Sequence, residues 1–323
     1  MRLLPGCLCS ILALYEGDRA WTLGKLSFPY NNLGVNINMD SSSGKMGDPR
    51  LMRREEVDKR SVVKEIVEYV QSYHRRAATK TLWKKPLVGF ALIEDPLFIR
   101  LKEVVSPKHA LPQDLLPTAK AVIAYFLPFE NNIQKANAEE GFYPARAWAV
   151  AYIETNRLIR DLGYHLKTFL ERAGYPAIST PPTHNYDQEL LVGDWSHRHV
   201  AYIAGLGRFG LHRWLITEKG CCGRLGSLVT EAFFTPTARP NHEFCLHFAG
   251  YECSACIEKC IYGALFLESF DRHVCNRHLL KNDAYFSELE TSDVCGKCGC
   301  GLPCSTRNPM AKKSFKRKSL PRG

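Results

Sequence analysis

The cysteines of this chain are distributed very unevenly, and this limits the kinds of fold that the sequence can adopt. Thirteen cysteines occur in 323 residues: none lies between residues 10 and 220, whereas nine lie between Cys245 and Cys304. Disulfide-rich secreted proteins are usually short and carry cysteines throughout, but here a large cysteine-free segment comes first. We therefore expect the cysteines to be metal ligands, in a protein of the reducing cytoplasm.

The sequence CSACIEKCIYGAL, residues 253–265, contains the most regular cysteine spacing. It reads Cys-x-x-Cys-x-x-x-Cys followed by Gly-Ala-Leu, which is similar to most of the cluster-binding run of a bacterial ferredoxin. Gly250 stands where that run has a further cysteine, and Ile261 stands where it has a proline. Cys245 can supply the missing ligand, with a loop of seven residues in place of a tight turn.

Eight of the cysteines can be divided into two sets of four, as two [4Fe–4S] clusters require. In two-cluster ferredoxins the fourth cysteine of each run binds the other cluster. Applied here, this crossing predicts a first thiol set of Cys245, Cys253, Cys256 and Cys304 and a second thiol set of Cys260, Cys275, Cys295 and Cys298. The remaining cysteines are Cys7, Cys9, Cys221, Cys222 and Cys300, of which Cys300 could replace a neighbour.

A pair of zinc sites is the alternative to the two clusters, because Cys-x-x-Cys pairs also suit tetrahedral zinc. The residues after Cys260 favour the clusters, since Ile-Tyr-Gly-Ala-Leu is similar to the turn and short apolar segment that follow the last cysteine of a ferredoxin run. The missing proline weakens this match but removes no ligand.

The segment before the cysteines contains both helical and strand patterns. Apolar residues at helical spacing predict a helix over residues 55–76 and a longer one over residues 144–173, which Gly174 and Pro176 would end. Apolar runs ended by proline predict buried strands, and shorter apolar segments predict further ones; these strands cover residues 86–93, 119–129, 177–180 and 226–234. We therefore expect an α+β or α/β domain around one sheet.

One motif in this segment suggests a different function. Residues 205–210 fit the pattern Gly-x-Gly-x-x-Gly, and Glu231 follows at about the distance of a ribose-binding carboxylate. A dinucleotide site needs a strand before the glycines and a helix after them. Here SHRHVAYIAG before them has a helical pattern and LHRWLIT after them is strand-like, so the order is reversed and the motif does not indicate a dinucleotide site.

The two ends of the chain differ in composition from the rest. Residues 1–50 combine an apolar run interrupted by Pro5 with a segment rich in Asn, Ser and Gly, and we expect a disordered or non-native extension rather than a targeting signal. Six positive charges of the net +10 lie in residues 312–323, which leaves +4 for the rest. We interpret the tail, residues 311–323, as a solvated end, with contact to RNA as the alternative.

The segment WSHRHVAYIAGLGRFGLHRWLIT, the later LGSLVTE and the cysteine groups occur in an order that resembles the epoxyqueuosine reductase family and the related reductive dehalogenases. The resemblance covers roughly residues 60–308. It implies a nitroreductase-like α/β sandwich domain that holds cobalamin, followed by a small two-cluster ferredoxin-like domain. In that family the clusters deliver electrons to cobalt, and the reaction removes an epoxide oxygen from a modified tRNA base.

The same resemblance implies the roles of particular residues. It implies that Arg198, Gly205, Gly207 and Gly210 lie against the cofactor. The family has an acidic proton donor about seven residues before the arginine, but Leu191 occupies that position here. A proton must reach the departing oxygen, so we expect a neighbouring carboxylate, Asp194 or Asp187, to act instead. Asp194 could equally be the cap of the helix that follows it.

Two classes of function remain open from the sequence. The first is a cobalamin-dependent reductase that acts on tRNA or on a small substrate, and the second is a non-catalytic ferredoxin-type electron carrier or corrinoid-reducing partner. We expect four segments: an extension over residues 1–50, the cofactor domain over 51–235, the cluster domain over 236–310 and the basic tail. A low-potential electron donor is the expected partner of a monomer. No membrane partner is expected, since no apolar run reaches ~18–20 residues.

Overall fold

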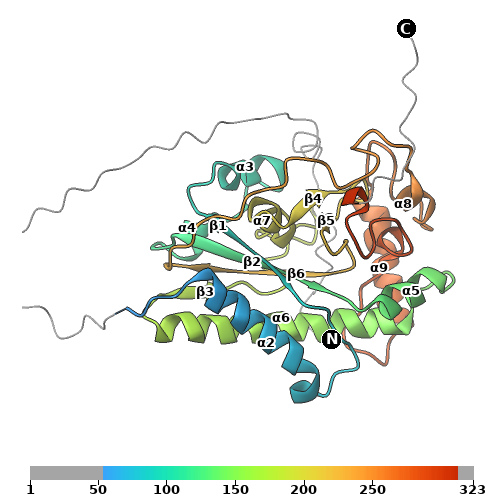
Figure 1. Ribbon diagram of the computed structural model, residues 1–323. Helices are drawn as coiled ribbons and strands as arrows, with labels where there is room; N and C mark the ends of the chain where they lie inside the picture. Colours follow the sequence, from blue (N-terminus) through green and yellow to red (C-terminus); the bar gives the residue numbers. More distant parts are fainter. Residues whose placement is uncertain (1–53, 312–323) are drawn as a thin grey trace, which may run out of the picture.

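A four-stranded antiparallel sheet forms the centre of the computed structural model, which describes residues 54–311 (Figure 1). The extension over residues 1–50, Cys7, Cys9 and nearly all of the basic tail lie outside these residues. The strands lie in the order β1 (Leu87–Leu92), β2 (Ala121–Pro128), β6 (Gly223–Thr230) and β3 (Ala177–Ser179). All four were predicted from apolar runs. The runs suit these strands because helices cover both faces of the sheet.

Strand β2 shows how the sequence divides the core into two halves. All eight of its residues are buried. Ile123, Tyr125 and Leu127 belong to one apolar cluster, whereas Val122 and Phe126 belong to a second cluster on the opposite face. Successive side chains of a strand point to opposite faces, so a continuous apolar run can fill two cores at once.

Two helices cover the first face of the sheet. Helix α2 (Lys59–Ala77) begins after Asp58, whose carboxylate accepts a hydrogen bond from the backbone N–H of Ser61 at 2.8 Å. Helix α6 (Arg146–Arg172) packs against α2 and against β3 and β6. Gly174 follows α6 with a φ of +87°, a conformation that glycine adopts without strain. The predicted long helix is confirmed, and the other predicted helix begins four residues later than expected.

The second face is covered by shorter elements. Helix α7 (His197–Ile203) lies against β2 and β6, and α3 (Leu97–Val104) packs against α7. The hairpin of β4 (Gly207–Phe209) and β5 (Leu215–Thr217) follows α7, and α4 (Pro112–Leu115) lies before β2. The glycine motif thus lies between a helix and a strand, in the order that the sequence predicted.

The cysteine-rich segment packs on one end of these layers, beside the short α5 (Asn131–Glu139) (Figure 1). Its elements are α8 (Ala255–Glu258), α9 (Arg272–Tyr285) and the 3₁₀ turns η2 (Lys297–Gly299) and η3 (Pro309–Ala311). Phe244, Leu279 and Val294 join the same apolar cluster as β2 and α6, so the segment shares its core with the first layer. The observed architecture is a mixed helix and sheet fold with antiparallel sheets. Among the described residues, no helix has the length and apolar character needed to cross a membrane.

Candidate functional site

The first thiol set surrounds a small cavity in the cysteine-rich segment. Cys245, Cys253, Cys256 and Cys304 all line this cavity, which has a volume of about 20 Å³, and His212 lines it as well. Cys245 is buried, and its burial raises the pKa of its thiol to about 11. Four thiols around one cavity are the donor set that an iron–sulfur cluster needs.

The thiols of the second set also lie near one another. Burial raises the pKa of the Cys298 thiol, and the neighbouring thiols of Cys295, Cys275 and Cys260 raise it further. A mutual electrostatic effect of this kind requires short distances between the sulfur atoms. The structure therefore brings the cysteines of the second set into one neighbourhood, and their division into two ligand sets stays a prediction.

The loop from Cys295 to Cys304 is pressed against two tryptophans. A Cβ atom at Gly296 would lie 2.3 Å from the Trp148 ring, and one at Gly299 would lie 2.4 Å from the Trp214 ring. Gly296 also has a φ of +73°. Only glycine fits such positions without displacing a neighbour. The glycines of the sequence Cys-Gly-Lys-Cys-Gly-Cys thus allow close packing, a role that the cysteine pattern alone does not indicate.

Polar contacts fasten the same loop to α5. The Asn137 side chain donates to the Cys295 carbonyl oxygen at 2.9 Å and accepts from the Ala145 backbone N–H at 2.9 Å. The Lys297 ammonium is buried and donates to the carbonyl oxygens of Asn137 and Glu140 at 2.9 and 2.8 Å. Because Lys297 stands between two cysteines of the second thiol set, its charge is available to offset the negative charge of bound thiolates.

An apolar cavity of about 60 Å³ lies between the sheet and the cysteine-rich segment. Its walls come from β2, α6, α7, β5 and β6, together with Val294 from the cysteine-rich segment. The lining residues are Phe126, Phe129, Trp148, Tyr152, His197, Arg198, Trp214, Leu215, Cys221, Gly223, Arg224, Leu225 and Val294. The indole N–H groups of Trp148 and Trp214 are buried without a hydrogen-bond acceptor. A bound ligand with acceptor groups could satisfy such donors.

His212, Trp214 and Cys221 separate this apolar cavity from the first thiol set. The Trp214 backbone N–H donates to His212 Nδ1 at 3.0 Å, so the proton of the neutral ring is on Nε2. His212 Nε2 lies 3.4 Å from the sulfur of Cys304. An N–H donor aimed at a ligand sulfur is one of the ways in which proteins tune a cluster.

Three cysteines outside the two sets are buried beside this wall. Cys222 Sγ lies 3.9 Å from Cys300 Sγ, and both Cys221 and Cys222 approach the Gly299 carbonyl oxygen. Within residues 54–311, the ligand atoms of His212, Cys221 and Cys304 all lie within 4.8 Å of one another, close enough to hold a metal ion. Cys304 therefore has two possible partners, the first thiol set and this smaller group.

Arg198 lies at the apolar cavity, but the three glycines of the motif do not. Arg198 is buried, and its guanidinium donates to the Arg213 carbonyl oxygen at 2.7 Å. The space beside each glycine is filled by the protein itself: a Cβ atom at Gly207 would lie 2.0 Å from the Ile216 carbonyl oxygen, and one at Gly205 would lie 2.8 Å from the Ala238 oxygen. At Gly210 the nearest atom belongs to His212, at 2.6 Å. These glycines allow close packing within the chain rather than form an open cradle.

The two candidate proton donors line a separate, polar pocket with Lys108 and Asn185. The Asp187 carboxylate accepts from the backbone N–H groups of Leu190 and Glu189, and these bonds, first that of Leu190, hold its pKa below the usual value. Asp187 thus supports its own turn as an ionised group, which does not suit a proton donor. Leu191, which stands where the family has its acidic proton donor, is buried and has a φ of +53°.

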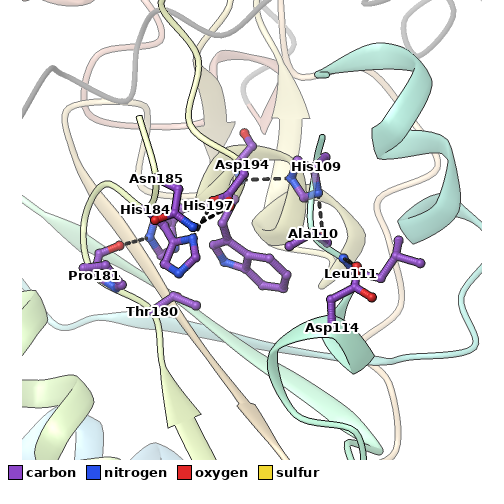
Figure 2. A network of polar contacts seen from close by, with 12 residues as sticks. His109, Ala110, Leu111, Asp114, Thr180, Pro181, His184, Asn185, Asp194 and His197 are labelled. Atoms are coloured by element: carbon purple, nitrogen blue, oxygen red, sulfur yellow. Dashed lines mark hydrogen bonds and ion pairs between the residues drawn. The ribbon is translucent and has the colours of Figure 1, made fainter. Parts of the chain in front are cut away.

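Asp194 makes different contacts, which Figure 2 shows from close by. Its carboxylate contacts His184 Nδ1 and accepts from the Asn185 side chain at 2.9 Å. The cap position of α7 belongs to Ser196, so the alternative role of Asp194 as the helix cap is not what the structure shows. His184 in turn is near enough to His197 to affect its pKa, and His197 lines the apolar cavity.

Two buried histidines near this network are held in the neutral form. Burial lowers the pKa of His197 to about 4 and that of His109 to about 4. His109 Nε2 accepts from the Ser196 backbone N–H at 3.0 Å, and Nδ1 donates to the Ala110 carbonyl oxygen at 2.7 Å (Figure 2). Protonation of Nε2 would break the first of these bonds, so the network requires an uncharged ring.

Comparison with known proteins places these features in context. No family model matches the chain. An epoxyqueuosine reductase of Bacillus cereus is 28% identical over 214 residues, which cover 64% of this chain and 52% of the relative. The chain thus spans about half the length of the curated relative that it matches. This similarity confirms the resemblance to the epoxyqueuosine reductase-like family that the motifs predicted.

Solved structures with a similar arrangement include an epoxyqueuosine reductase from Bacillus subtilis, with a TM-score of 0.48, 18% identity and coverage of 79% of this chain and 70% of that one. Another is an epoxyqueuosine reductase with a tRNA stem loop, with a TM-score of 0.46, 19% identity and coverage of 78% and 72%. A catabolic reductive dehalogenase has a TM-score of 0.45, 13% identity and coverage of 70% and 30%.

The close packing of the cysteine loop can be tested with a pair of glycine variants. Gly296 and Gly250 both have a positive φ, +73° and +84°, but only at Gly296 would a Cβ atom meet another residue. We expect Gly250→Ala to cost about 1 kcal/mol in backbone strain. Gly296→Ala should lower the midpoint of thermal unfolding by clearly more, because the Trp148 ring must also move. Equal midpoints for the two variants would contradict this account of the loop.

The neutral histidine can be tested through the pH dependence of stability. The pKa of His109 is lower in the folded chain than the ~6.5 of an unfolded one, so the unfolded state alone takes up a proton as the pH falls from 6.5 towards 4. This should cost roughly 2 kcal/mol of unfolding free energy between about pH 7.5 and pH 5. We expect His109→Gln to reduce that pH dependence, measured by urea unfolding. His242→Gln, a change at an exposed histidine, should keep the dependence of the original chain.

Proposed function

We propose that the protein is a reductase of the kind its curated relative represents, with two [4Fe–4S] clusters and a cobalamin as cofactors and a modified tRNA base as substrate. The observation that carries the proposal is that the first thiol set lies beside an apolar cavity. Cys221 lines the apolar cavity, and its sulfur lies within 4.8 Å of the ligand atoms of His212 and Cys304, which line the thiol cavity. An enzyme that moves electrons from a cluster to a second centre needs the two sites to lie close together, with protein rather than solvent between them.

The thiol sets support the cluster assignment through their chemistry. Each set offers four sulfur ligands, and the described residues hold no carboxylate or imidazole in a comparable position except His212. In this proposal Cys245, Cys253, Cys256 and Cys304 hold one cluster, and Cys260, Cys275, Cys295 and Cys298 hold the other. His212 would donate its Nε2 proton to the sulfur of Cys304, and Lys297 would balance the charge of the second set.

The apolar cavity supports the cobalamin assignment. The cavity of about 60 Å³ is smaller than a corrin, so a bound cobalamin would have to extend beyond it. The indole N–H groups of Trp148 and Trp214, which find no acceptor within residues 54–311, suit the amide oxygens around a corrin. Arg198 and Arg224 add positive charge for a phosphate. We assign Arg198 to cofactor binding, whereas Gly205, Gly207 and Gly210 would act through the packing of the β4–β5 hairpin. When bound, the clusters and the cobalamin would supply the electron transfer and the reductive step.

The chain itself must supply a proton to the oxygen that leaves the substrate. We propose Asp194 for this role rather than Asp187, because the Asp187 carboxylate accepts hydrogen bonds from the backbone N–H groups of the turn that follows it. Asp194 contacts His184, which lies near His197 at the cavity. Asp194 lines the polar pocket and not the apolar cavity, so in this proposal the departing oxygen would approach Asp194 from that pocket.

The remaining parts of the proposal follow from the same assignment. The segment up to about residue 235 would be the nitroreductase-like cofactor domain, and residues 236–310 would be the ferredoxin-like domain. The protein would act in the cytoplasm as a monomer, with an external low-potential electron donor. The alternative, a ferredoxin-type electron carrier or corrinoid-reducing partner, uses the thiol sets but leaves the apolar cavity without a role.

The clusters can be tested by analysis of metal and sulfide. After anaerobic reconstitution we expect about eight iron and eight labile sulfide atoms per chain, as two [4Fe–4S] clusters contain. Cys245→Ser should lose roughly half of this iron, because one ligand of the first set is gone. Cys222→Ala, which changes a buried cysteine outside both sets, should keep the full content. Tightly bound zinc without sulfide would instead support the zinc alternative.

Cobalamin binding can be tested by equilibrium dialysis with hydroxocobalamin under reducing and oxidising conditions. We expect saturable binding in the micromolar range, as for many cofactor sites, and a loss of binding in Trp214→Ala. Asp194→Asn should bind cobalamin as the original chain does but lose turnover, since it cannot donate a proton. An absence of saturable binding, with a full content of iron, would leave only the electron-carrier function.

A further inference from the structure

The exposed side of α9 carries a group of residues that neither the thiol sets nor the apolar cavity explains. We call it the α9 face and define it as His273, Arg277, Leu280, Lys281 and Tyr285. Their spacing of three and four residues places them on one side of the helix. Leu280 and Tyr285 are 52% and 55% exposed, although both are large and apolar. Side chains of this type on a surface commonly mark a contact with another molecule.

The opposite side of α9 lies directly against the second thiol set. Cys275 belongs to the helix, and the Asn282 side chain donates to the Val294 carbonyl oxygen at 2.8 Å, one residue before Cys295. The Tyr262 hydroxyl donates to Asn282 Oδ1 at 3.1 Å. The α9 face is thus the outer surface of the element that holds the second thiol set in place.

A layer of aromatic rings connects the α9 face with that set. Tyr262 and His278 stack with ring centroids 3.8 Å apart, and Tyr285 stacks on Tyr143 at the same distance. Phe142, which is 55% exposed, meets Tyr262 edge to face at 5.3 Å. Cys260 and Cys275 are only half-buried beneath this layer. A redox centre held by the second thiol set would therefore lie close to the surface at this place.

The α9 face carries the positive charges of Arg277 and Lys281. Arg277 and Lys281 are one turn apart, and neither forms an ion pair within residues 54–311. Like charges at this spacing destabilise a helix by roughly 0.2–0.5 kcal/mol, so the pair does not serve the fold.

The carboxylates nearest in the chain are engaged elsewhere. Asp271 accepts from the Val274 backbone N–H, and Asp283 accepts from that of Ser292. Glu288 pairs with Arg146. Among the described residues, none of these three carboxylates forms an ion pair with the two cations of the face.

From these observations we infer that the α9 face is the docking surface for a small acidic redox protein, which delivers electrons to the second thiol set. Complexes of electron-transfer proteins are small and short-lived, and opposite charges steer their encounter. Two cations beside a few exposed apolar side chains suit a partner whose own redox centre is surrounded by carboxylates. The inference rests on the proposed function, because it requires a cluster in the second set.

The test compares two matched pairs of charge reversals. One variant carries Arg277→Glu and Lys281→Glu on α9, and the other carries Arg60→Glu and Lys64→Glu, exposed cations at the same spacing on α2. A reduced, acidic [2Fe–2S] ferredoxin serves as the protein probe, and reduced methyl viologen serves as a small donor that needs no docking. Cluster reduction is followed by stopped-flow absorbance at low and high salt.

We expect the α9 variant to react with the ferredoxin at least about tenfold more slowly at low salt, with a weaker dependence on salt, because steering is lost. Its reduction by methyl viologen and its iron content should not change, and the α2 variant should behave like the original chain. Arg277→Gln with Lys281→Gln should give an intermediate rate.

An unchanged ferredoxin rate in the α9 variant, with full iron content, would overturn the docking surface alone. The docking surface would also be overturned if the variant lost affinity for a tRNA stem loop while its ferredoxin rate stayed unchanged, since the face would then be an RNA surface. A chain without clusters would overturn both the docking surface and the proposed function, and the iron content identifies that case.

Discussion

The return of Cys304 to the first thiol set is the constraint on which the rest of the structure depends. Its three companions lie between residues 245 and 256, so the chain must cross the second thiol set and come back before the first set is complete. The returning loop has room only because Gly296 and Gly299 allow it to contact the rings of Trp148 and Trp214. Those rings also line the apolar cavity, so one loop shapes both sites.

This arrangement couples the two halves of the chain without a linker between them. The apolar cluster of β2 and α6 continues into Phe244, Leu279 and Val294, and Asn137 binds the loop at Cys295. The thiol sets and the cavity wall therefore belong to one tightly packed and rigid body. The same rigidity gives the α9 face a fixed position above the second set, as a docking surface for electron transfer needs.

Several elements could be predicted from the sequence because their signals are local. The apolar runs of β1 and β2, the helical pattern of α6 and its end at Gly174 depend on neighbouring residues alone. Helices α3, α5 and α9 were not predicted. In α3 the buried Phe98, Leu101 and Val104 do recur at helical spacing, but over only eight residues. Helix α9 has few apolar residues on its buried side and is held by contacts such as that of Asn282 with Val294, so tertiary packing decides this helix.

The sequence by itself predicted the composition of the thiol sets, because cluster ligation depends on which cysteines are present and on the crossing rule between runs. Tertiary structure alone decided what surrounds them. His212, Trp214 and Cys221 are far from the cysteine runs in the sequence, and only the fold brings them between the first set and the apolar cavity. The carboxylates also differ only in the folded chain: backbone N–H groups bind Asp187, whereas the side chains of His184 and Asn185 bind Asp194. A chemical role that depends on hydrogen-bond partners can be assigned only once those partners are in place.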